Sequence, residues 1–223
     1  MDRDELLRVL RAFQEKDLEY VLIGATAMGF HGLIRATEDV DLLIRPTPEN
    51  VERLRKALQD TYSDDPSIQD IRTEDLLGDY PAVRYYPVNG DLFFDILTRL
   101  GDAASYETVE SQKFEVEGVR VQVATPQALY KLKKDTVRPI DTGRTQPLSE
   151  SGLNWETDNM SVERFRSIEE MNSARNHRDT RDAFERFVRH CARYRLISRR
   201  SNPHGVFKFH SIEEAQAARQ ISG

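Results

Sequence analysis

The chain has 223 residues, of which 39% are hydrophobic and 31% charged, and its formal net charge is -6. This composition is typical of a globular chain of one or two domains, and no apolar run is long enough to cross a bilayer. The single cysteine excludes a disulfide framework and a multi-cysteine zinc site, which favours a reducing, cytoplasmic location. The acidic balance argues against general nucleic-acid coating. We therefore expect no DNA partner and no membrane partner.

Helical and extended patterns alternate along the first half of the chain. Apolar residues recur at helical spacing near the N-terminus, and short apolar runs bounded by glycine or proline predict buried strands. In chain order the sequence predicts a helix over 3–16, a strand over 20–23, a short helix over 25–30, a strand over 39–44 and a helix over 47–60.

Two hairpins and another helix follow an acidic stretch. Residues 62–80 are broken by proline and glycine, which predicts a loop with a short helix. Asn89-Gly90 separates two apolar runs and is a strong hairpin signal. The remaining predicted elements are strands over 82–87, 91–97, 114–116 and 119–123, and a lysine-bearing helix that begins at Thr125-Pro126.

The character of the chain changes after residue 141. Residues 142–160 lack periodicity and are rich in small and polar residues, which predicts a linker between a domain over 1–141 and a basic, mainly helical region over 161–223. In that last region the pattern predicts a helix over 182–196, a strand over 206–209 and a final helix from Ser211. One interpretation is a fusion with a second small protein; the other is a helical subdomain that packs on the first domain.

Two acids, Asp39 and Asp41, mark the second predicted strand. Alternation along a strand places both carboxylates on one face and the apolar residues between them on the other. Adjacent carboxylates repel each other, and a magnesium ion that also binds substrate phosphates would remove that repulsion. The alternative is a pair of solvated acids on an edge strand.

Three other features favour the magnesium interpretation. Gly24 ends the preceding strand and opens a short helix, where backbone N–H groups suit a phosphate. Arg35 and Thr37 lie between this glycine and the acids and are placed to reach the same phosphates. Asp95 stands in an apolar strand, where an acid without a partner is costly.

This order of a strand, a glycine, a short helix, an Asp-x-Asp strand and a later acid resembles the nucleotidyltransferase superfamily related to DNA polymerase beta. More narrowly, IGATAMGFHGLIRATEDVDLLI is similar to the AbiEii-type toxin group, and TPQALYKLKKDTVRPID resembles the C-terminal helix of such domains. The resemblance covers residues 1–141. It implies an α+β nucleotidyltransferase fold, a mixed β-sheet flanked by helices.

The resemblance also implies roles for individual residues. Asp39, Asp41 and Asp95 would be the catalytic acids and would hold one or two magnesium ions, while His31 is expected to bond Asp39 or a ribose or to serve only the structure. The nucleoside triphosphate would be bound by Gly24, Ala25, Thr26, Arg35, Thr37 and Lys133.

One residue departs from the family pattern. Ala25 occupies a position where glycine or serine is usual, so a hydroxyl is missing there unless Thr26 supplies one. The expected function is transfer of a nucleoside monophosphate to a tRNA 3′ end or a protein hydroxyl, as the toxin of a toxin–antitoxin or phage-defence system. The expected partners are therefore a nucleoside triphosphate and either tRNA or a cognate antitoxin. The alternative is a catalytically weak or inactive module that binds nucleotide or a partner protein.

Overall fold

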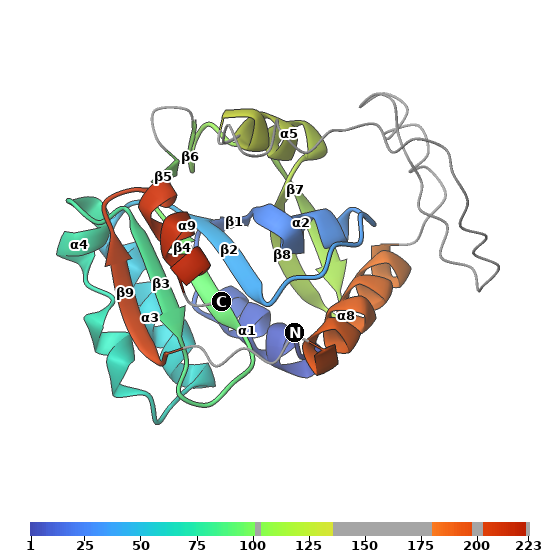
Figure 1. Cartoon of the computed structure of the whole chain (residues 1–223), viewed down its shortest axis with the longest axis horizontal. Helices are drawn as coiled ribbons and strands as arrows, with labels where there is room; N and C mark the ends of the chain where they lie inside the picture. Colours follow the sequence, from blue (N-terminus) through green and yellow to red (C-terminus); the bar gives the residue numbers. More distant parts are fainter. Residues whose placement is uncertain (101–103, 136–179, 198–202, 222–223) are drawn as a thin grey trace.

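The computed structural model describes residues 1–100, 104–135, 180–197 and 203–221, and a seven-stranded mixed sheet forms its centre (Figure 1). The strands in that sheet follow the order β7-β8-β1-β2-β4-β3-β9. Their bounds are Tyr20–Leu22 for β1, Asp39–Ile44 for β2, Ala82–Tyr86 for β3, Phe93–Leu97 for β4, Ser111–Val116 for β7, Val119–Ala124 for β8 and Gly205–Phe209 for β9. The fold is therefore α+β with a mixed sheet, as predicted.

Helices flank this sheet on both faces. They are α1 (Arg3–Glu15), α2 (Gly24–Phe30), α3 (Pro48–Thr61), α4 (Thr73–Leu77), α5 (Pro126–Asp135), α8 (Thr180–Ile197) and α9 (Ile212–Ile221). None of the helices in the described ranges has the length and apolar character needed to cross a membrane.

Alternation along β2 divides the interior into two layers. Val40, Leu42 and Ile44 join the apolar side chains of α1 and α3 in one buried cluster. Leu43 points the other way and belongs to a second cluster, to which α5 and α9 contribute. In Figure 1, α1 and α3 lie behind the sheet and α9 lies in front of it. Asp39 and Asp41 share the face of Leu43, because side chains two positions apart on a strand point the same way.

Local sequence signals account for most element boundaries. Thr47 caps α3 by accepting a hydrogen bond from the backbone N–H of Asn50, and Pro48 occupies the first turn. Both predicted hairpins are present as antiparallel pairs, β3 with β4 and β7 with β8. The acidic stretch over 62–80 holds a 3-10 helix (Pro66–Asp70) before α4. A two-stranded sheet of β5 (Arg99–Leu100) and β6 (Ala104–Ser105) is an addition that the sequence did not predict.

The described part of the C-terminal region packs on the first domain. β9 pairs antiparallel with β3 and forms the edge of the central sheet. α8 buries Phe184 and Phe187 in the cluster that also holds Phe30 of α2. The strand and both helices predicted for this region are thus present. The linker predicted over 142–160 lies outside the described residues, so the division into two domains stays a prediction.

Candidate metal and nucleotide site

The turn between β1 and α2 requires a glycine for two reasons. Gly24 has a φ of +66°, a conformation that side-chain-bearing residues rarely adopt. A Cβ atom at this position would lie 2.7 Å from Cγ of Asp41 and still closer to Oδ2 of that carboxylate. The backbone of the turn therefore lies directly against the second acid of the Asp-x-Asp pair.

Three carboxylates meet on the face of the sheet beside this turn. β2 and β4 are parallel neighbours in a register that places Asp41 opposite Asp95 and Asp39 opposite Phe93. Asp39, Asp41 and Asp95 each offer an oxygen, and these oxygens all lie within 4.8 Å of one another. Asp39 and Asp95 are 5% and 7% exposed. Clustered carboxylate oxygens are the donors that a hard cation such as magnesium prefers, so the residues present fit a divalent ion.

Two threonines hold the first of these acids from either side. The hydroxyl of Thr37 donates to Oδ1 of Asp39. The hydroxyl of Thr26, which is fully buried, donates to the backbone carbonyl of Asp39 at 2.9 Å. Thr26 therefore ties α2 to β2, and its hydroxyl is not available to replace the one missing at Ala25. A contact between a phosphate and the backbone N–H of Thr26 stays a prediction.

A residue that sequence reasoning missed, Arg84, lies beside Asp95. Its guanidinium donates through Nε to Oδ1 at 2.7 Å and through Nη2 to Oδ2 at 3.2 Å, and the arginine is only 3% exposed. β3 and β4 pair in a register that places Arg84 opposite Asp95. A signal was present in the sequence, because a hairpin centred on Asn89-Gly90 pairs position 84 with position 95. The acid in the apolar strand thus has a protein partner as well as a place in the cluster.

The remaining predicted site residues are placed as follows. Ala25 is buried in the first turn of α2, and Arg35 is exposed on the loop before β2. The Nε2 atom of His31 lies 2.7 Å from the carbonyl of Ala124, which requires the proton on Nε2, and a bond from this residue to Asp39 or a ribose stays a prediction. Lys133 belongs to α5, but its side chain lies outside the described residues, so a contact with the triphosphate stays a prediction.

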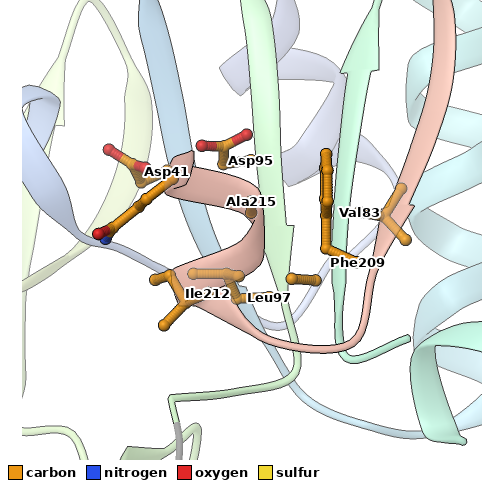
Figure 2. A pocket seen from close by; sticks show the side chains of 9 residues that line it. Asp41, Val83, Asp95, Leu97, Phe209, Ile212 and Ala215 are labelled. Carbon is orange, nitrogen blue, oxygen red and sulfur yellow. The ribbon is translucent and has the colours of Figure 1, made fainter. Parts of the chain in front are cut away.

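A pocket opens beside the acids, between the sheet and the C-terminal helix (Figure 2). Asp41 and Asp95 form one part of its wall, and Ile212 and Ala215 of α9 form another part (Figure 2). Phe209 of β9 and Leu97 of β4 complete the apolar part. The acids therefore face a space that is bounded on one side by the C-terminal segment.

Comparison with known proteins agrees with this geometry. Residues 6–134 match the family described as "Nucleotidyl transferase AbiEii toxin, Type IV TA system". No curated protein and no solved structure matches the chain. The matched range contains the glycine turn, all three acids and Arg84, whereas β9 and α9 lie beyond it. With more than half of its length matched, the chain belongs to the AbiEii family of nucleotidyltransferase toxins of type IV toxin–antitoxin systems.

Proposed function

We propose that this protein transfers a nucleoside monophosphate from a nucleoside triphosphate to a hydroxyl acceptor and requires magnesium to do so. The observation that carries the proposal is the convergence of Asp39, Asp41 and Asp95 within 4.8 Å on one face of the sheet, directly beside Gly24. Three carboxylates at this spacing together match the donor set for a divalent ion.

The proposal assigns each residue a task. Asp39 and Asp41 would hold the ion, and a bound ion would supply charge neutralisation for a reaction in which the acceptor hydroxyl displaces pyrophosphate from the α-phosphorus. Gly24 and Ala25 offer backbone N–H groups to the phosphates. Asp95 lines the pocket, where it would complete the metal site and help to activate the attacking hydroxyl. Arg35, exposed on its loop, and Lys133 are the proposed cationic contacts to the triphosphate.

The acceptor and the partners complete the proposal. A tRNA 3′ end and a serine, threonine or tyrosine side chain both present the hydroxyl that the reaction needs, and a cognate antitoxin follows from the toxin–antitoxin family. An inactive nucleotide-binding module is the alternative, supported by Ala25 at a position that usually carries glycine or serine.

Transfer of label from a nucleoside triphosphate tests this proposal. The protein is incubated with each α-³²P-labelled triphosphate, magnesium, and either total tRNA or cell protein. Label is expected in one acceptor class, and Asp41→Asn is expected to abolish it. Asp91→Asn is the matched control, because Asp91 is an acid of the hairpin that carries Asp95, its carboxylate pairs with Arg195 of α8, and it lies outside the cluster. Transfer that survives Asp41→Asn contradicts the assignment, and magnesium-dependent triphosphate binding without transfer supports the inactive module.

A further inference from the structure

Among the described residues, Arg84 is a buried cation in direct contact with the candidate site. It is 3% exposed, and the side chain of its partner Asp95 is 10% exposed. A buried ion pair is held together by the cost of leaving either charge alone, so the two groups stay paired while nothing else balances Asp95. Both oxygens of Asp95 accept hydrogen bonds from the one guanidinium. A divalent ion that binds Asp95 must therefore share the carboxylate with a positive charge.

The C-terminal segment fixes the guanidinium in this position. Nη2 of Arg84 also donates to the backbone carbonyl of Ala215 in α9 at 3.0 Å. The ring of Phe209 in β9 covers the guanidinium, with 5.4 Å between the ring centroid and Cζ. The strand that carries Phe209 is hydrogen-bonded along the whole of β3, from Ala82 to Tyr86. Arg84 thus cannot swing away from Asp95 without losing contacts to two elements that lie outside the family-matched range.

The hydrogen-bond partner of Asp95 differs in charge from the threonine that bonds Asp39. Asp39 is bonded by the neutral hydroxyl of Thr37, which orients a carboxylate without opposing a cation. Asp95 is bonded by a full positive charge, which orients the carboxylate and repels a cation at the same time. We propose, on the basis of the function proposed above, that Arg84 is a positioning residue that holds Asp95 in competition with a divalent ion, and that β9 and α9 hold Arg84 in place.

Binding of Mn²⁺, which suits the same oxygen ligands as magnesium, tests this inference without any nucleotide or acceptor. Free Mn²⁺ is measured by electron paramagnetic resonance during titration of the full-length protein. Arg84→Gln removes the charge, and its apparent dissociation constant for Mn²⁺ should fall roughly tenfold or more, because a nearby unit charge no longer opposes the ion. Arg84→Lys keeps the charge and should restore an affinity close to that of the wild type.

Two further variants show whether the increase in Mn²⁺ affinity of Arg84→Gln depends on Asp95 and on the position of the lost charge. The double variant Arg84→Gln/Asp95→Asn should lose the gain, since the carboxylate that the ion would capture is gone. Arg45→Gln is the matched control for loss of one arginine charge. Arg45 follows the end of β2 and pairs with Glu19. The Arg45→Gln variant should therefore bind Mn²⁺ with the affinity of the wild type.

Folding is followed by circular dichroism, because Arg84→Gln leaves a buried carboxylate without its arginine. Phe209→Leu serves if that variant does not fold: it removes the ring that covers the guanidinium and keeps both charges, so it should tighten Mn²⁺ binding in the same direction but less. The inference is overturned if the folded variants bind Mn²⁺ no more tightly than the wild type. Wild-type Mn²⁺ binding that does not depend on Asp41 overturns the proposed function instead, and no Mn²⁺ binding by any variant overturns both.

Discussion

Replacing Gly24 by alanine tests whether the β1–α2 turn is built around the Asp41 carboxylate. Two costs add in this variant. An alanine at a φ of +66° costs roughly 1–2 kcal/mol in backbone strain. The new methyl group overlaps the carboxylate of Asp41, and relief of such an overlap in a packed site costs a further 1–3 kcal/mol or so. The sum is about 2–5 kcal/mol.

Gly118→Ala provides a matched control for the backbone term. Gly118 lies in the β7–β8 turn with a φ of +76°, and a Cβ atom there meets nothing within 4 Å. Backbone strain is therefore the only cost that should lower the stability of this variant. For a chain of this size each kcal/mol lowers the melting temperature by roughly 2–4 °C. We expect a decrease on the order of 10 °C for Gly24→Ala and of about 4 °C for Gly118→Ala.

Thermal unfolding measures the loss of stability in the two variants, and Mn²⁺ titration shows whether Asp41 has been displaced. Because relief of the overlap displaces Asp41, Gly24→Ala should also bind Mn²⁺ more weakly, whereas Gly118→Ala should bind it as the wild type does. Equal melting temperatures for the two variants, with wild-type Mn²⁺ affinity in both, would show that the close approach between Gly24 and Asp41 has no energetic consequence.

Three further predictions concern groups around the site and in the core. Thr26→Val should cost about 1–3 kcal/mol in urea unfolding, because the carbonyl of Asp39 loses a buried donor; an unchanged midpoint would contradict this. Burial acts to raise the pKa of Asp65, but hydrogen bonds from Ser67, the Val88 backbone and Tyr85 outweigh it and hold that pKa below its ordinary value. A lowered folded-state pKa stabilises the fold above the unfolded pKa, so the deficit of Asp65→Asn measured at pH 7 should shrink as the pH falls below about 4. Burial raises the pKa of the Cys191 thiol, so a thiol reagent at pH 8 should modify it only at the rate of unfolding, and rapid labelling of the native protein would count against its burial.

Patterns that act over a few residues were predicted well from the sequence. The period of two along β2 placed Asp39 and Asp41 on one face, and the buried clusters confirm the opposite orientation of Val40, Leu42 and Ile44. Asn89-Gly90 predicted the hairpin of β3 and β4 because the turn and the register are set by the same few residues.

Features that depend on tertiary placement could not be predicted in this way. Residues 206–209 were predicted as a strand, but no turn links them to β3, which lies more than a hundred residues earlier, so nothing local fixed their partner or register. The role of Thr26 likewise depends on how closely α2 approaches β2, and the hydrogen bond of His31 depends on where β8 ends. Sequence reasoning therefore placed the acids on one face of the strand but did not find the hydrogen bonds that hold their neighbours.

Asp95 shows why a motif alone leaves the chemistry of such a site open. An acid in an apolar strand implies a positive partner, and that requirement is met equally by a metal ion and by an arginine. The structure supplies the arginine, and the cluster of three carboxylates supplies the reason to expect an ion. The two are compatible in geometry, because an ionised carboxylate has about four acceptor positions and Arg84 uses two of them. The arginine and the ion conflict only because both are positively charged. The contacts of β9 and α9 that keep Arg84 in place should therefore influence how strongly Asp95 binds an ion.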